Sequence, residues 1–183
     1  MILPIYVYGS PVLKKVAEPV TELTPELTAF IADMWETMYN ANGVGLAAPQ
    51  VGKSIRLFVV DGSGFGDDEP TAKDFKRVMI NPEFVEFSEE TCSYNEGCLS
   101  LPQLYEDVKR PARVRVQYLD ESFVPQDEWL EGMPARMVQH ENDHLNGVLF
   151  VDHLAMIRKK LIGSRLQRMM KGNYSSRYRT KIG

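Results

Sequence analysis

The hydrophobic and polar positions of the chain follow two periods, and each period predicts a different kind of element. In residues 112–120, ARVRVQYLD, Val and Tyr alternate with Arg and Gln, which is the pattern of a strand with one face in the core. The run SIRLFVV, residues 54–60, predicts a buried strand. Strand character returns in residues 76–87, KRVMINPEFVEF, where we expect Asn81-Pro82 to break the strand.

Three other segments have apolar residues at helical spacing. Thr24 and Pro25 are typical of a helix start and predict an N-terminal helix over about 25–42. A second helix is predicted over about 133–146, and a third over about 153–170. Strands and helices follow one another without regular alternation. The predicted fold class is therefore α+β, with antiparallel or mixed sheets packed around the helix at 133–146.

Length and composition indicate one globular domain. The chain has 183 residues, of which 44% are hydrophobic and 25% charged, enough for one substantial core. We expect a single domain over residues 1–170 and a basic, disordered tail over residues 171–183. No apolar run is long enough to span a membrane, the first residues lack the features of a signal peptide, and only two cysteines occur. These features predict a cytoplasmic protein in a reducing compartment.

Charge is distributed unevenly along the chain. The formal net charge is -4, yet nine Lys or Arg residues and no acidic residue follow Asp152. Such a basic segment can contact an anionic partner such as RNA, and it can equally be a solvated helix face. We expect neither a membrane nor DNA as a partner.

The stretch QHENDHLNG, residues 139–147, carries the strongest chemical signal. His140 and His144 are four residues apart, so a helix places them one turn apart on the same face, where both imidazoles can bind one metal ion. Glu141 completes the HExxH pattern, in which the glutamate takes a proton from metal-bound water. The alternative is a pair of satisfied histidines on a buried helix face.

A catalytic metal of this kind usually has three protein ligands, and Cys98 in EGCLSLP, residues 96–102, is the candidate for the third. Metal coordination would keep its thiol deprotonated, whereas the alternative for Cys98 is a small buried hydrophobic residue. GVGLAAPQ, residues 43–50, adds glycines that let a backbone approach a ligand, and it ends in the hydrogen-bond donor Gln50. A helix cap followed by a turn would explain the same glycines.

In this order and separation, GVGLAAPQ, EGCLSLP and QHENDHLNG closely resemble the three signature motifs of the peptide deformylases. The resemblance covers most of the chain, from VLKKVAEPV near the start to GVLFVD after the histidines. It implies a catalytic domain over residues 1–170 in which sheets pack around a central metal-binding helix. It also implies an enzyme that removes the formyl group from the N-terminal formyl-methionine of nascent polypeptides and releases formate.

The resemblance assigns the chemistry to four residues. Cys98, His140 and His144 would bind one divalent metal ion, which in this family is Fe(II), with Zn(II) or Ni(II) as alternatives. A metal-bound hydroxide would attack the formyl carbon. Glu141 would act as general base and then as general acid.

The resemblance also assigns residues to the oxyanion and to the peptide. The Gln50 side-chain amide and the Leu99 N–H would stabilise the oxyanion. The peptide would bind as an extended strand against the segment around Gly45. Val44 and Met137 would line the pocket for the methionine side chain, although Met137 can equally be a core residue.

Three other functions remain consistent with the motifs. HExxH is also the signature of metallopeptidases, which cleave unformylated peptides. A non-enzymatic module could hold a structural metal and bind RNA or the ribosome through the basic C-terminal segment. A deformylase-like relative without activity is a third alternative, but Gln50, Leu99 and Glu141 are all present. For an active deformylase, the same basic segment would contact the ribosome, where formylated nascent chains emerge.

Overall fold

The computed structural model describes residues 1–183 as a mixed α+β fold, which confirms the predicted fold class. The helices are α1 (Pro25–Asn40), α2 (Gly132–Leu145) and α3 (Met156–Met170). The strands are β1 (Ile5–Tyr6), β2 (Gly45–Ala47), β3 (Leu57–Asp61), β4 (Lys76–Phe87), β5 (Thr91–Cys98), β6 (Leu101–Pro111), β7 (Arg113–Leu119), β8 (Pro125–Glu131) and β9 (Thr180–Lys181).

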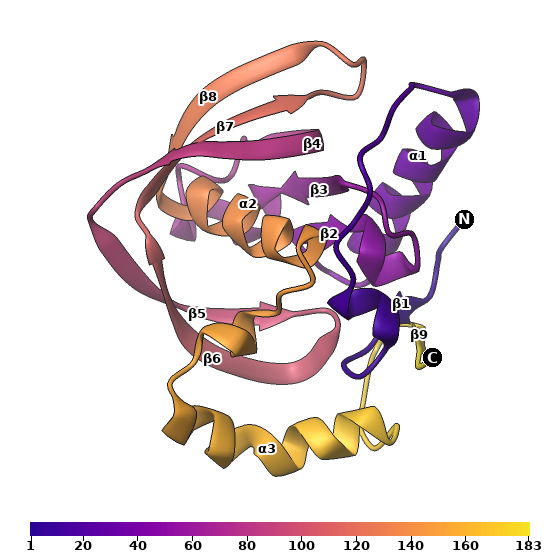
Figure 1. The fold of residues 1–183 in the computed structure, drawn as a ribbon, viewed down its shortest axis with the longest axis vertical. Coiled ribbons are helices and arrows are strands. Elements are labelled where there is room, and N and C mark those ends of the chain that lie inside the picture. Colours follow the sequence, from indigo (N-terminus) through magenta and orange to yellow (C-terminus); the bar gives the residue numbers. More distant parts are fainter.

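Helix α2 runs through the middle of the molecule between two antiparallel sheets (Figure 1). One sheet has five strands in the order β2-β3-β4-β7-β8, and the other is the long hairpin β5-β6. Strand β2 is therefore an edge strand, with one side free for pairing. None of the helices is both long and apolar enough to cross a membrane.

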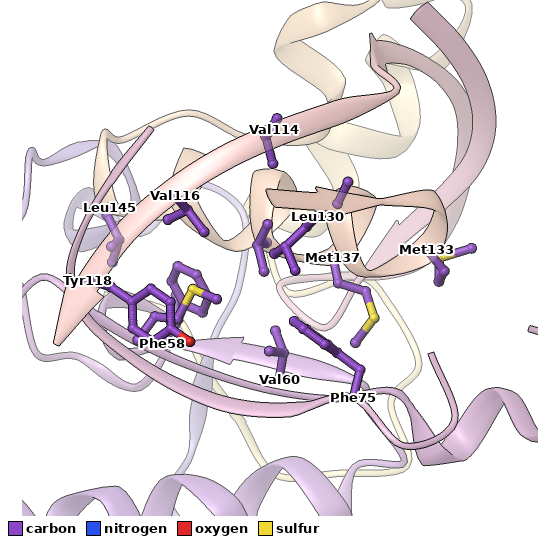
Figure 2. Close-up of a cluster of buried hydrophobic side chains, with 14 of the residues drawn as sticks. Phe58, Val60, Phe75, Val114, Val116, Tyr118, Leu130, Met133, Met137 and Leu145 are labelled. Atoms are coloured by element: carbon purple, nitrogen blue, oxygen red, sulfur yellow. The ribbon is translucent and has the colours of Figure 1, made fainter. Parts of the chain in front are cut away.

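The central helix packs against one face of the five-stranded sheet (Figure 2). Alternate residues of β7 point toward the helix, as the period-2 pattern predicted, and β3 is buried throughout, as its apolar run predicted. Met133, Met137 and Leu145 of α2 meet Phe58 and Val60 of β3 and Val114, Val116 and Tyr118 of β7. This packing fixes the position of α2 relative to β2. The site forms between these two elements.

The opposite face of the same sheet is covered by α1. Leu57 and Val59 alternate with the residues that face α2, so both faces of β3 are buried. The predicted helix start is confirmed, because the Thr24 hydroxyl accepts a hydrogen bond from the Leu27 N–H at 3.1 Å. Helix α3 packs through Ile162 and Met169 on the outer side of the β5-β6 hairpin.

Two predicted boundaries differ in the structure. The third helix begins at Met156 rather than about residue 153, because residues 150–153 form a separate 3-10 turn in which the Asp152 carboxylate accepts from the Leu149 N–H at 2.8 Å. Strand β4 is not broken at Asn81-Pro82. It passes through with a shift of register between Ile80 and Glu83, and the Asn81 side chain bonds the Val20 backbone.

The expected disordered tail over residues 171–183 is ordered in the structure, which corrects that prediction. Strand β9 pairs in parallel with β1, with Ile5 opposite Thr180. The Ile5 N–H donates to the Arg179 carbonyl and the Val7 N–H to the Lys181 carbonyl, both at 3.0 Å. Because the partner strand lies at the other terminus, the local sequence of the tail contains no sign of this pairing.

Candidate active site

The two histidines of α2 lie on its buried face, beside the end of β5. Their ligand atoms and the Cys98 sulfur all lie within 4.8 Å of one another. The His144 Nε2 is 3.3 Å from the Cys98 Sγ, and His144 is only 1% exposed. The three predicted metal ligands are therefore brought together from two elements, although Cys98 and His140 are more than forty residues apart in the chain.

Cys98 is placed by a tight turn between β5 and β6. Cys98 pairs with Leu101, so Leu99 and Ser100 form the two-residue connection of this hairpin. Ser100 is fully buried, and its carbonyl accepts a hydrogen bond from the Tyr8 N–H at 2.9 Å. The turn thus presents the thiol and the Leu99 backbone at the same point.

The chemistry of these three side chains fits a divalent metal ion. A thiolate with two imidazoles suits zinc, ferrous iron, nickel and cobalt. The His140 Nδ1 lies 2.8 Å from a Glu96 carboxylate oxygen, which leaves its Nε2 as the ligand atom. Burial lowers the pKa of His144 to about 3, so its ring is neutral, the form that binds a metal.

Glu141 lies next to the two histidines and faces the same space. It is 5% exposed, and its Oε2 atom is buried without a hydrogen-bond partner. Burial raises the pKa of Glu141 to about 7, which suits a group that takes and returns a proton near neutral pH. Gly45 makes room for this carboxylate, because a Cβ at Gly45 would overlap the Glu141 Oε1 atom.

Gln50 is buried opposite the helix, and its amide has a fixed orientation. The Ala47 N–H donates to the Gln50 Oε1 at 2.9 Å, which turns the Nε2 group toward the hairpin turn. That Nε2 donates to the Ser100 hydroxyl at 3.1 Å and lies 3.5 Å from the Cys98 sulfur. The donor therefore stands beside the three ligand atoms.

A cavity of about 660 Å³ joins these groups. All the residues that the sequence predicted for the site line it, except His144, which lies behind the others. Those lining residues are Val44, Gly45, Gln50, Cys98, Leu99, Met137, His140 and Glu141. Met137 is 5% exposed and belongs to the core cluster around α2, so it is a core residue and a cavity residue at once.

A buried ionic network, which no sequence motif predicted, lies beneath the histidines. The Glu96 carboxylate accepts from Arg110 at 2.7 and 3.0 Å and from Arg136 at 2.7 Å, in addition to its contact with His140. Arg110 also donates to Asp143 at 2.8 Å. Burial alone would raise the pKa of Glu96, but the hydrogen bonds from His140 and Arg110 outweigh it and hold that pKa well below its usual range.

Glu96 lies two residues before Cys98 in β5, and residues two apart in a strand point to the same side. That spacing could have indicated Glu96, but no strand was predicted over residues 91–98. The third histidine is not a ligand, because the His153 Nε2 lies 2.7 Å from an Asp143 carboxylate oxygen instead.

Comparisons with known proteins agree with the motifs. The family model described as polypeptide deformylase matches residues 2–160. A protein named peptide deformylase from Flavobacterium johnsoniae is 48% identical over 189 residues, covering 100% of this chain and 96% of the relative. The crystal structure of a peptide deformylase from Legionella pneumophila matches with a TM-score of 0.82 at 38% identity, covering 93% of this chain and 96% of that chain. The crystal structure of peptide deformylase from Thermotoga maritima matches with a TM-score of 0.77 at 44% identity, covering 85% of this chain and 99% of that chain. The chain therefore belongs to the polypeptide deformylase family.

Proposed function

We propose that this chain is a metal-dependent hydrolase that removes the formyl group from the N-terminal formyl-methionine of nascent polypeptides in the cytoplasm. The observation that carries the proposal is the meeting of a Cys-His-His cluster with Glu141 and Gln50 in one cavity, in a member of this family. The products are formate and a peptide with a free amino terminus.

Cys98, His140 and His144 would hold the metal ion. When bound, the metal polarises the formyl group and lowers the pKa of water. Glu141 takes a proton from the attacking water and then delivers one to the departing amine. Its burial supports this double role, because a carboxyl group with a pKa of about 7 both accepts and releases protons near neutral pH.

Gln50 and Leu99 act on the oxygen of the formyl group. As the carbonyl carbon becomes tetrahedral, this oxygen gains negative charge, and the Gln50 Nε2 and the Leu99 N–H would donate to it. The bond from Ala47 to Gln50 supports this role, since it holds the donor end of the amide toward the site before substrate arrives.

The free edge of β2 supports binding of the peptide as an added strand. Gly45 is the first residue of this edge strand, and Gly45 and Val44 both line the cavity. Backbone hydrogen bonds to such an edge do not depend on the side chains of the peptide, which suits an enzyme with many substrates. Val44 and Met137 would form the apolar surroundings of the methionine side chain.

Formate release from a formyl-methionyl tripeptide tests the function and the metal together. We propose Fe(II) as the working ion, with Zn(II) or Ni(II) giving slower enzymes, and we expect the anaerobic iron form to lose activity in air because ferrous iron beside a thiolate is open to oxidation. Formate is assayed for the iron-loaded and zinc-loaded proteins side by side. Absence of release from every metal form of the folded protein would exclude the deformylase reaction.

The same assay separates the alternative functions. Cleavage of an unformylated peptide would indicate a metallopeptidase. A structural metal in a binding module usually has four protein ligands, whereas one group of three is found here.

We further propose that α3 contacts the ribosome. Lys159, Lys160 and Arg168 are exposed on it and make no ion pair within the chain, and exposed Met156 and Ile157 lie beside them. Replacing the three basic residues by Glu should weaken ribosome binding, most strongly at low salt, because counterion release contributes to binding of basic surfaces to nucleic acid. The measurement is co-sedimentation with ribosomes.

A control variant with the same net charge distinguishes a specific effect of α3 on ribosome binding from an effect of net charge alone. It changes three exposed lysines outside α3 to Glu: Lys15, Lys73 and Lys109. Equal ribosome binding by both variants would contradict a role for α3. Deleting the whole segment is unsuitable, because residues after α3 line the cavity.

A further inference from the structure

The segment that follows α3 reaches back to the active site. Residues 174–181, here called the C-terminal strap, lie outside the family match to residues 2–160. Ser175, Ser176, Arg177 and Tyr178 line the cavity that contains the Cys-His-His cluster. The strap is therefore one wall of that cavity, although no motif in its sequence predicted this position.

Tyr178 connects the strap to the hairpin turn that carries the site. Its hydroxyl donates a hydrogen bond to the Leu99 carbonyl at 2.6 Å. A carbonyl can only accept, so the phenol is the donor. The ring is half-buried and packs against the apolar cluster between α1 and the five-stranded sheet.

The strap is held by hydrogen bonds within it and by the pairing of its C-terminal end with β1, so Tyr178 has a fixed position. The Ser176 hydroxyl donates to the Tyr178 carbonyl at 2.8 Å and accepts from the Tyr178 N–H at 3.1 Å. Further along, β9 pairs with β1 at the other end of the chain. A side chain on such an anchored segment can hold another part of the molecule in place.

The contact controls the geometry of one residue in the turn. Leu99 has two soft backbone dihedrals, and they set the direction of its N–H relative to its carbonyl. The next carbonyl, that of Ser100, is already fixed by the Tyr8 N–H at 2.9 Å. Leu99 lines the cavity, and with its carbonyl fixed by Tyr178 its backbone keeps little freedom to rotate.

We propose that Tyr178 is a positioning residue, whose hydroxyl fixes the Leu99 carbonyl and thereby aims the Leu99 N–H at the oxygen of the formyl group. This role rests on the proposed deformylase function. It predicts that loss of the hydroxyl impairs the transition state more than substrate binding, since the donor matters most when the oxygen becomes charged.

The test compares Tyr178→Phe with Tyr174→Phe, which removes a hydroxyl from the same strap without touching the turn. For Tyr178→Phe we expect kcat to fall by about tenfold with KM near the wild-type value, a smaller loss than removing an oxyanion donor outright. For Tyr174→Phe we expect both constants to stay near wild type. A kcat for Tyr178→Phe equal to that of Tyr174→Phe would overturn the proposal.

Nuclear magnetic resonance of the zinc form supplies a readout that is independent of activity. The dipeptide Leu-Ser occurs once in the chain, so carbon-13 in leucine carbonyls and nitrogen-15 in serine give one correlation, for Leu99–Ser100. It should shift in Tyr178→Phe and stay in place in Tyr174→Phe. An unmoved signal overturns the role of Tyr178, whereas a wild-type protein that releases no formate with any metal contradicts the proposed function itself.

Discussion

Glu141→Gln should lower the rate of formate release by on the order of a thousandfold while the protein keeps its metal. Gln has the shape of Glu but cannot accept a proton from water at neutral pH. The wild-type carboxylate is buried, has an unpartnered oxygen and lies beside the two histidines. The other carboxylate that lines the cavity, Glu96, is already paired with two arginines and His140. The Glu141 side chain is not among the three ligand candidates, so the metal should stay.

The measurement is formate release with metal content determined on the same samples. Glu131→Gln is the matched control, because it makes the same chemical change at the exposed residue before α2, away from the cavity. The control should keep the wild-type rate. A Glu141→Gln protein that retains its metal and still releases formate at more than about a tenth of the wild-type rate would contradict the role of Glu141 as base.

The residues of the candidate site were predictable because each lies in a short local motif. Helical spacing alone put His140 and His144 on one face, and the structure places Cys98 beside them. Strands β3 and β7 followed from their hydrophobic pattern for the same local reason. The family resemblance then supplied what spacing could not, namely that segments far apart in the chain meet.

Strands with few apolar residues at their buried positions were not predicted from the sequence. In β6, the buried positions alternate along the strand but include the charged residues Glu106 and Arg110 as well as Leu104 and Val108, so a count of apolar residues does not find the alternation. Strand β8 lies at the edge of the sheet and buries only Leu130, which leaves no pattern to detect. The order of the C-terminal strap depends on contacts with the opposite end of the chain, which no local rule contains.

Buried charged residues connect the β5-β6 hairpin to α2. Glu96 of β5, Arg110 of β6 and Arg136 of α2 tie three elements together directly under the His140 ring. A buried carboxylate surrounded by two arginines holds the histidine in one orientation, with Nδ1 on Glu96 and Nε2 free to act as a metal ligand. The network thus links the stability of the hairpin to the geometry of the site.

Glu96→Gln should therefore damage both stability and metal binding. The substitution removes the only carboxylate paired with the buried Arg136 and one of the two carboxylates paired with Arg110, and breaking a buried pair in this way costs about 3–5 kcal/mol. The His140 ring also loses the charged carboxylate that orients it. We therefore expect the affinity for the metal to fall about 10–100-fold. Urea unfolding of the zinc form and competition with a zinc chelator measure the two effects.

Asp127→Asn is the control, because it breaks the contact with Arg115 at 2.7 Å on the exposed side of β8. A surface pair of this kind contributes at most about 1 kcal/mol.

Because the pKa of Glu96 is held below its unfolded value, its contribution to stability is present at neutral pH and is lost as the pH falls toward the folded value. The wild type should thus lose stability in acid while Glu96→Gln loses less. If Glu96→Gln were no less stable than Asp127→Asn and bound zinc as tightly as the wild type, the network would not support the metal site.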